Sequence, residues 1–400
     1  MGVVKLASSI GTTLRVAGLF AGIGGFEEGL RRSGHATILL CEKDPAALAV
    51  LRDHFPNRRP KKDIREIDHL TGRPQLLTAG FPCQDLSQVG TGVGLGGSKS
   101  SLVRHVFRLL KEANSRRQPV EWVLIENVPF MLRLGRGAAL EVIVRELERL
   151  KYRWAYRIVD TRAFGLPQRR ERVFLLASRK HDPRTVLLGD DRGPKYQDFN
   201  GSRPACGFYW TEGNRGLGWG VNVIPTLKGG SGLGIPSPPA IWLKDGRLVK
   251  PGITDAERLQ GFDRDWTAAA EGAPGAARSA RWRLVGNAVT VDVAEWIGAR
   301  LLDPGSYDSG EAKRIAAGAR WPSAAWNMDY RKSTRHESFE TSWPVRRRSR
   351  DLDSFVKEPS DLSVRATAGF HARFLDSSLR RVGNYRDGLI PALEAHLAES

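Results

Sequence analysis

The 400-residue sequence predicts an α/β fold: a doubly wound, mostly parallel sheet with a small loop-rich domain and a further C-terminal segment. Short apolar runs typical of buried strands alternate with amphipathic helical stretches through the first 180 residues. Several of these runs end at a polar residue, and sheets of this kind hold ligands at the carboxyl ends of their strands. After residue 180 the sequence is rich in Gly, Pro, Trp and Tyr without helical periodicity, which indicates loops and short strands.

The first expected element is a strand over 14–19 that leads into a glycine turn. Gly22, Gly24 and Gly25 form the turn, and a helix follows over 26–32. A turn without Cβ atoms lets the backbone approach a ligand at the helix N-terminus. The dinucleotide-binding pattern G-x-G-x-x-G does not apply, because Glu27 stands where the third glycine would be.

A second strand is expected over 37–41, and Glu42 stands at its carboxyl end. A carboxylate about 20 residues after a glycine turn is placed to bind ribose hydroxyls. Alternatively, Glu42 is only the N-terminal charge of the helix that begins near Pro45. Asp63 and Ile64 follow a basic patch, and on residue type alone Asp63 is an ordinary loop aspartate.

The stretch over 80–87, Gly-Phe-Pro-Cys-Gln-Asp-Leu-Ser, follows an expected strand over 76–79. Pro82 restricts the backbone immediately before Cys83, and the glycine-rich run over 91–97 can move. A cysteine on a stiff turn beside a mobile loop is arranged like a nucleophile under a lid. Because a lone cysteine is more often a buried structural residue, this interpretation depends on the other motifs of the chain.

The later elements extend the alternation of strands and helices. The strand that ends at Ile125 delivers Glu126, and an arginine-rich motif over 168–172 stands just before the last strand of this part. The helices expected in this later part span 100–113, 138–150 and 286–302, and the strands span 122–125, 152–159 and 173–177.

The charge of the chain favours a polyanionic partner. The formal net charge is +18, and nucleic acid is the commonest partner of so basic a protein. Residues 303–400 hold 16 Lys and Arg against 14 Asp and Glu, a net of +2, so +16 falls in the first 302 residues. Part of this surplus is ordinary solvated surface, yet it overlaps the motifs, as a phosphate-lined cleft requires.

The three cysteines, Cys41, Cys83 and Cys206, form no CxxC pattern or Cys/His cluster. Neither structural zinc nor a disulfide framework is therefore expected, and no other metal is indicated. The sequence has no 18-residue apolar run, so we expect no membrane span. These features fit a reducing compartment, where a free thiol survives.

Five motifs in this order resemble the C5-cytosine-specific DNA methyltransferases of bacteria. They are Phe20-Ala-Gly-Ile-Gly-Gly, Pro82-Cys-Gln, Glu126-Asn-Val, Gln168-Arg-Arg-Glu-Arg and Gly286-Asn-Ala-Val. The match runs from about residue 14 to residue 300. The resemblance implies methyl transfer from S-adenosyl-L-methionine to C5 of a cytosine flipped out of duplex DNA. It also implies a monomer that acts in the bacterial cytoplasm.

The resemblance also implies a role for each motif residue. Cys83 would attack C6 of the base, Glu126 would bind or protonate N3, Arg172 would hold the base oxygen, and Arg170 would assist. The methyl donor would lie against Phe20, Gly22 and Gly24, with Glu42 on its ribose, Asp63 and Ile64 on its adenine, and Asn287 and Val289 on the far side. Gln84, Ser87 and Arg169 would contact DNA.

The resemblance divides the chain into three parts. A catalytic domain is expected over 12–180, completed by 284–302; a small target-recognition domain is expected over 181–283; and 303–400 is expected to form an accessory unit. Within the recognition domain, 181–222 would set the site, with Lys195, Arg203 and Arg215 in reach of bases or phosphates. The C-terminal segment would mainly add affinity or stability.

Two alternatives stay open at this level. One is a methyltransferase of the same fold that acts on transfer RNA, and the other is a catalytically inactive DNA-binding relative. The intact Cys83, Glu126 and Arg172 set argues against the inactive relative, because binding alone requires none of them. The sequence leaves open the recognised site and whether the enzyme works beside a restriction endonuclease.

Overall fold

The computed structural model describes residues 12–81, 102–194, 204–210, 218–229, 238–375 and 383–398, apart from single positions 275, 278, 311, 317 and 333. These residues form two compact units. The first unit comprises Met1–Asp160, Glu171–Pro194 and Val289–Arg346, and the second comprises Thr161–Arg170, Lys195–Ala288 and Arg347–Ser400. Each unit is therefore assembled from three separate stretches of the chain.

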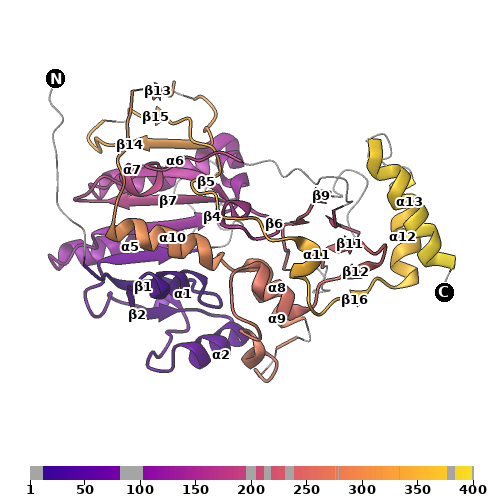
Figure 1. Cartoon of the computed structure of the whole chain (residues 1–400). Helices are drawn as coiled ribbons and strands as arrows, with labels where there is room; N and C mark the ends of the chain where they lie inside the picture. The colour runs from indigo at the N-terminus through magenta and orange to yellow at the C-terminus, as the bar shows by residue number, and fades with distance from the viewer. Residues whose placement is uncertain are drawn as a thin grey trace. The chain divides into compact units, whose positions relative to one another are not determined.

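A nine-stranded mixed sheet forms the centre of the first unit (Figure 1). Its order is β13-β15-β14-β5-β7-β4-β3-β1-β2, and β2, β1, β3 and β4 are mutually parallel. β7 runs antiparallel to both β4 and β5, so β5 has the direction of β4. The main strands are β1 (Arg15–Leu19), β2 (Ala36–Cys41), β3 (Leu76–Ala79), β4 (Trp122–Asn127), β5 (Arg153–Asp160) and β7 (Glu171–Ser178).

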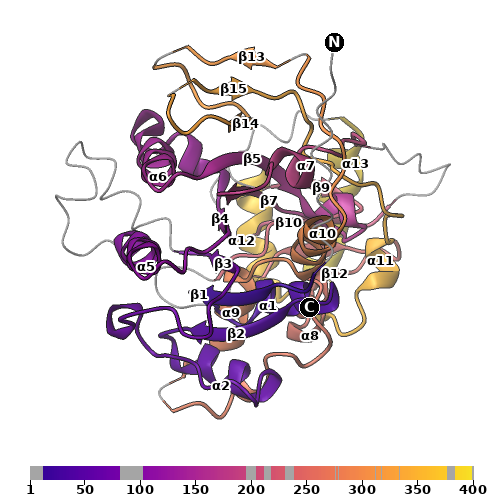
Figure 2. The same ribbon diagram turned by 90° about the vertical axis from the view of Figure 1, so that its left-hand side faces the viewer.

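Helices cover both faces of this sheet, which confirms the doubly wound arrangement (Figure 2). The helices α5 (Val103–Ser115) and α6 (Ala138–Arg149) bury leucines, valines and isoleucines against one face. On the other face α1 (Gly25–Arg32) packs against α10 (Val291–Leu302), which also contacts α7 (Arg184–Leu187). The remaining elements of this part are α2 (Pro45–His54), η1 (Ile64–Glu66), η2 (Pro129–Leu132) and η3 (Leu134–Gly137).

The single helix expected over 286–302 is wrong at its start. The structure has two helices here, α9 (Ala280–Asn287) and α10, separated by extended backbone at Ala288 and Thr290. The break has a physical reason, because Arg170 donates a hydrogen bond of 2.7 Å to the carbonyl of Ala288, which a continuous helix would use internally.

The segment after residue 302 is divided between the two units. Its first part adds three short strands to the β5 edge of the large sheet: β13 (Lys313–Arg314), β14 (Ala324–Asn327) and β15 (His336–Glu337). Its second part, from Arg347, joins the second unit. The boundaries therefore differ from the separate accessory unit expected over 303–400.

The second unit contains a five-stranded antiparallel sheet of order β16-β12-β11-β8-β9. The C-terminal helices α12 (Val364–Leu375) and α13 (Gly383–Ala398) share one buried cluster with it, and the rings of Phe208 and Phe370 lie 4.6 Å apart. The other elements of this unit are β8 (Cys206–Phe208), β9 (Gly220–Val221), β11 (Ala240–Trp242), β12 (Leu248–Lys250), β16 (Ser360–Asp361), β6 (Gln168–Arg169), β10 (Ile224–Pro225), η4 (Thr161–Phe164), η5 (Ala268–Ala270), α8 (Ile253–Leu259) and α11 (Leu352–Phe355).

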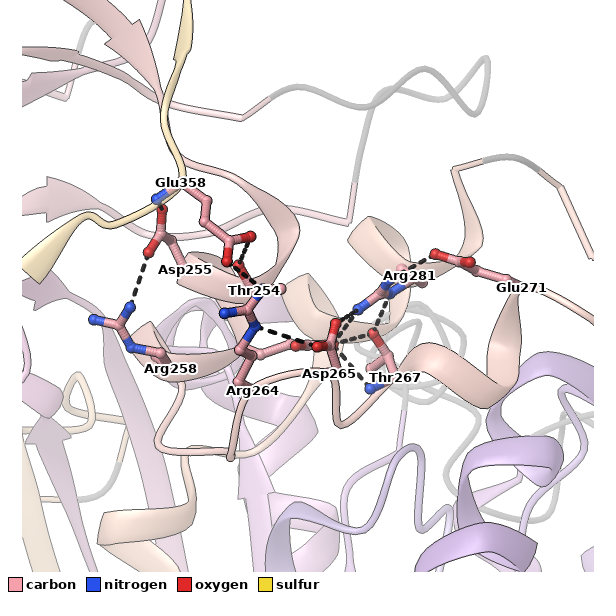
Figure 3. Close-up of polar contacts among 10 residues, drawn as sticks. Thr254, Asp255, Arg258, Arg264, Asp265, Thr267, Glu271, Arg281 and Glu358 are labelled. Carbon is pink, nitrogen blue, oxygen red and sulfur yellow. Dashed lines mark hydrogen bonds and ion pairs between the residues drawn. The ribbon is translucent and has the colours of Figure 1, made fainter.

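A network of charged side chains attaches the C-terminal segment to α8 (Figure 3). The carboxylate of Asp255 is fully buried and accepts hydrogen bonds from the backbone of Lys357 and Glu358 at 2.9 and 3.0 Å. Its Oδ1 also accepts a bond from Arg258. Beside this anchor, Arg281 bonds to the buried Glu257. Because buried carboxylates need such partners, the C-terminal segment is an integral part of the second unit.

No helix within the described ranges is long and apolar enough to cross a membrane.

Candidate active site

The glycine turn after β1 adopts backbone angles that few residues tolerate. The φ angles of Phe20, Gly22 and Gly24 are 56°, 57° and 87°, all in the left-handed region. A Cβ at Gly24 would stand 2.8 Å from the ring of Phe55, whereas a Cβ at Gly22 would meet nothing within 4 Å. The turn therefore packs against the protein on one side and leaves room against its backbone at Gly22.

Glu42 holds this turn through its side chain. The amide of Gly22 donates to Oε2 of Glu42 at 2.8 Å, and Oε1 accepts from the amides of Lys43 and Asp44 at 2.7 and 2.8 Å. Asp44, in turn, caps α2. The sequence allowed Glu42 to be either a ribose-binding carboxylate or the N-terminal charge of a helix. The structure is compatible with both, since the half-buried carboxylate stands at the end of β2 beside the glycine turn and also before α2.

Asp63 and Ile64 follow shortly after the isolated β-bridge that joins this segment to the end of β2. The carboxylate of Asp63 is already hydrogen-bonded to a neighbouring side chain. Arg65 donates to both of its oxygens, and this hydrogen-bonded cation lowers the pKa of Asp63 to about 2. Ile64 is buried, and its carbonyl accepts a bond of 3.1 Å from Arg108. An adenine-binding role for Asp63 would require Arg65 to share or release this carboxylate.

The carboxyl ends of β3 and β4 bring three of the motifs together. Gly80 follows β3, and a Cβ there would lie 3.7 Å from Oε2 of Glu126 and 3.9 Å from the side chain of Val289. Asn127 donates a buried hydrogen bond of 3.0 Å to the carbonyl of Phe81. Cys83, Gln84 and Ser87 lie outside the described residues, so the structure places only the backbone that leads to the cysteine.

Arg172 on β7 faces Glu126 on β4. Its Nε lies 3.1 Å from Oε1 of Glu126, and both side chains are largely shielded, with exposed fractions of 14% and 11%. The antiparallel pairing of β4 with β7 places the two residues at the same end of the sheet. A carboxyl group and a guanidinium thus converge beside Gly80, three residues before Cys83 in the sequence.

Arg170 and Arg169 have different surroundings, and both belong to the second unit. The guanidinium of Arg170 is 1% exposed and donates to the carbonyls of Leu227, Gly286 and Ala288 at 2.7–3.1 Å. These bonds position the 286–288 segment, and a part for Arg170 in catalysis stays a prediction. Arg169 is exposed, as a DNA-contacting residue would have to be. Asn287 ends α9 with an exposed side chain.

Comparison with known proteins decides between the functions that this geometry allows. Residues 14–205 match the family model described as C-5 cytosine-specific DNA methylase. The type II methyltransferase M2.BsuMI of Bacillus subtilis (strain 168) is 44% identical over 391 residues, which cover 95% of this chain and 97% of that protein. The chain belongs to this family.

The methyltransferase has further relatives over part of its length. The type II methyltransferase M.PspPI of Psychrobacter sp. (strain TA137) is 37% identical over 165 residues, 40% of this chain and 38% of that protein. Among solved structures, the S. pombe Dnmt2 methyltransferase has a TM-score of 0.52 at 18% identity, over 72% of this chain and 98% of that chain, and so shares its fold.

The chain is accordingly a type II DNA (cytosine-5-)-methyltransferase of the restriction-modification kind. Membership implies S-adenosylmethionine-dependent methyl transfer and a DNA substrate. It favours the DNA enzyme over the two alternatives that the sequence left open.

Three residues of the methyltransferase have roles that local sequence does not reveal. Asn127 is part of a motif, but only the fold shows that it holds Phe81. Gln168 is fully buried and bonds to the amide of Leu227 at 2.9 Å and the carbonyl of Leu259 at 2.8 Å. Glu27 is 1% exposed, and neither carboxylate oxygen has a hydrogen-bond partner among the described residues. The one sequence feature that could have predicted the burial of Glu27 is its position as a polar residue in a stretch that otherwise faces the core.

Glu27 should make the stability of the methyltransferase depend on pH. Burial, with a smaller contribution from Glu42, raises the pKa of Glu27 to about 7 from an ordinary value of 4.5. The folded state therefore binds a proton that the unfolded state releases, so stability falls as pH rises from about 4.5 through 7. Glu27→Gln should raise the free energy of unfolding by roughly 3 kcal/mol more at pH 8 than at pH 4.5. Urea unfolding at the two pH values measures this difference.

The neighbouring Glu28 provides a control of opposite sign. Although burial acts to raise its pKa, hydrogen bonds from Arg31 and Arg32 hold the pKa of Glu28 below its ordinary value. Its stabilising contribution is present above pH 4.5 and is lost as pH falls through the folded-state pKa. Glu28→Gln should therefore destabilise the protein at pH 8. If both variants changed stability in the same direction at pH 8, the assignment of Glu27 as a buried acid would be wrong.

Proposed function

We propose that Cys83, Glu126 and Arg172 carry out the methyl transfer of this enzyme. The observation that supports this most directly is the Glu126–Arg172 pair, which lies beside Gly80, three residues before the cysteine. The other two cysteines are poor candidates, since Cys41 and Cys206 are both buried. Burial, with the nearby Glu42 and Asp63 charges, raises the pKa of the Cys41 thiol to about 12 and keeps it protonated.

In the proposed mechanism the Cys83 thiolate forms a bond to C6 of the flipped cytosine, and this makes C5 nucleophilic. Glu126 holds a proton at N3, which stabilises the negative charge that develops on the ring. Arg172 orients Glu126 and binds the base oxygen. When bound, S-adenosylmethionine supplies an electrophilic methyl group. After C5 is methylated, a base removes its proton, the C6–sulfur bond breaks, and the free thiolate returns.

The residues around the glycine turn fit the methyl donor. The open space against Gly22 lets a ligand approach the backbone, and Glu42 stands beside it at the end of β2. We propose that Glu42 binds the ribose, that Phe20, Gly22 and Gly24 contact the methionine part, and that Asp63 and Ile64 contact the adenine. Val289, which lies against Gly25 and Gly80, and Asn287 would complete the site.

Trapping with 5-fluorocytosine tests the nucleophile. Bisulfite sequencing of DNA from a host that expresses the chain first gives the methylated sequence. A duplex with 5-fluorocytosine at the target position should then form a stable covalent complex, because fluorine cannot leave as the proton does. Peptide mapping should find the adduct on Cys83. An adduct on Cys41 or Cys206, or methylation by Cys83→Ala, would exclude this mechanism.

We further propose that the second unit reads the DNA sequence and that a cognate restriction endonuclease acts on the same site without forming a complex with this chain. The candidates for base or phosphate contacts over 181–222, Lys195, Arg203 and Arg215, lie outside the described residues. Gln84 and Ser87 would contact DNA beside the cysteine, and Arg169 would do so from the second unit. Exchanging 195–222 for the corresponding stretch of a relative should change the methylated sequence without abolishing donor binding.

A further inference from the structure

The first unit has a basic cavity that the proposed mechanism does not use. It has a volume of about 560 Å³ and lies between the loop that leads into α6 and the segment around β13. Four arginines line it, with one acidic side chain and a tryptophan: Arg136, Arg145, Arg314, Arg335, Glu141 and Trp321. The lining therefore carries a surplus of three positive charges. A volume of this size accommodates a nucleotide unit of a polymer as well as a bare anion.

The arginines of the cavity differ in whether a carboxylate already pairs with their positive charge. Arg145 and Arg335 both pair with Glu141. The guanidinium of Arg335 lies 5.0 Å from the ring centre of Trp321, and its Nε is shut off from solvent without a hydrogen-bond acceptor among the described residues. Arg136 and Arg314 are exposed and form no ion pair with another described residue. The cavity thus offers two available guanidinium groups to an anion.

The backbone adds to this positive surface. Gly135, Arg136 and Gly137 have φ angles of 58°, 57° and 90°, and no side chain caps the start of α6. Gly137 in the left-handed region is followed by Ala138 at φ −60° and ψ −31°. Such an alternation of left-handed and right-handed residues turns successive amides toward one side, an arrangement that binds anions. Trp321 fixes this loop, because its Nε1 donates to the carbonyl of Gly137 at 3.1 Å.

The cavity and Glu126 belong to the same sheet, several strands apart. One row of paired residues crosses four strands, from Glu126 on β4 through Phe174 and Arg157 to Ala324 on β14. Two more strands follow, since β14 pairs with β15 and β15 pairs with β13, which carries Arg314. Five steps between adjacent strands amount to roughly 24 Å. Because each DNA strand has one phosphate per about 3.4 Å of helix axis, this separation corresponds to about seven nucleotides.

We propose that this cavity binds a backbone phosphate of the DNA substrate about seven nucleotides from the target cytosine, chiefly through Arg136 and Arg314. The proposal rests on DNA being the substrate of the enzyme. The chemistry of the lining favours this ligand: guanidinium groups and backbone amides recognise phosphate oxygens, and neither reads a base. The C-terminal segment would then contribute to DNA binding, by completing a phosphate site of the first unit.

The test compares two double variants of the full chain. Arg136→Gln/Arg314→Gln removes both available charges of the cavity. Arg117→Gln/Arg331→Gln is the control, since both arginines are exposed and lie at the opposite ends of β4 and β14. Arg117 has the same φ of 57° as Arg136, so the two changes are matched in backbone strain as well.

The cavity variant should bind the target duplex at least tenfold more weakly at 50 mM salt. The slope of log Kd against log salt should fall by about one, because each phosphate that is neutralised contributes about 0.9 to this slope. Single-turnover methylation at saturating DNA should keep its rate, which separates failure of this proposal from failure of the catalytic assignment. Equal salt slopes for the cavity and control variants would overturn the proposal.

Two further measurements identify the ligand. Replacing single phosphates by methylphosphonates should weaken binding to the wild type at one or two positions, and the same replacements should cost nothing with the cavity variant. A ³¹P titration with inorganic phosphate tests a free anion as the ligand. Phosphate binding that is lost in the cavity variant, with the DNA salt slope unchanged, would show a site for free phosphate and refute the DNA assignment.

Discussion

Glu126→Gln should lower the single-turnover rate of methylation by about 10²–10⁴-fold, the usual contribution of a positioned acid or base. The amide keeps the shape of the side chain and can still lie beside Arg172, but it cannot transfer a proton to N3 of the base. Affinity for the methyl donor should change little, because Glu42 and not Glu126 stands beside the glycine turn. Rapid-quench kinetics with labelled donor measure the rate, and calorimetry measures the affinity.

Glu121→Gln is the matched control for this experiment. Glu121 directly precedes β4 and pairs with Lys180 and His181, so its loss removes the same charge at the opposite end of the strand from Glu126. Its methylation rate should stay within a few-fold of the wild type. A Glu126→Gln enzyme that methylates as fast as the Glu121→Gln control would remove Glu126 from the mechanism.

Phe370→Ala should destabilise the second unit by about 3–5 kcal/mol, the usual cost of removing a buried phenyl group. Phe370 is fully buried on α12 and packs between Phe208 of the small sheet and Phe374. A loss of this size is a large part of the net stability of a typical domain. Thermal unfolding and limited proteolysis should both show a weakened second unit.

Val364→Ala serves as the control, because Val364 lies on the same helix with an exposed side chain. It should change the free energy of unfolding by no more than about 0.5 kcal/mol. Deleting 347–400 altogether should leave the second unit unfolded, so truncation cannot separate a role in affinity from a role in folding. Wild-type stability in Phe370→Ala would show that α12 does not complete this core.

Much of the candidate active site was predictable from local sequence. Apolar runs that end in Glu42 and Glu126 predicted strands with functional residues at their carboxyl ends, and the structure places both residues there. The glycines at 22 and 24 predicted a tight turn before a helix, and the structure has this turn ahead of α1. These predictions succeed because each depends on the residue itself and its immediate neighbours.

The features that escaped prediction depend on residues far apart in the chain. β13 and β15 are two-residue strands, Lys-Arg and His-Glu, whose polar composition gives no strand periodicity. They exist because β14 offers a sheet edge to β15, and β15 in turn pairs with β13. Similarly, Arg170 bonds to carbonyls 57–118 residues away, and no local pattern could show that these bonds interrupt the helix expected over 286–302.

The way the chain alternates between its two units has a consequence for protein synthesis. The polypeptide crosses from one unit to the other five times, and the last stretch of each unit lies after residue 288. A ribosome adds about 5–20 residues per second, so neither core can close until the chain is nearly finished, tens of seconds after initiation. A nascent or prematurely terminated chain should therefore have no activity, and the newly made enzyme should begin to methylate only after its release from the ribosome.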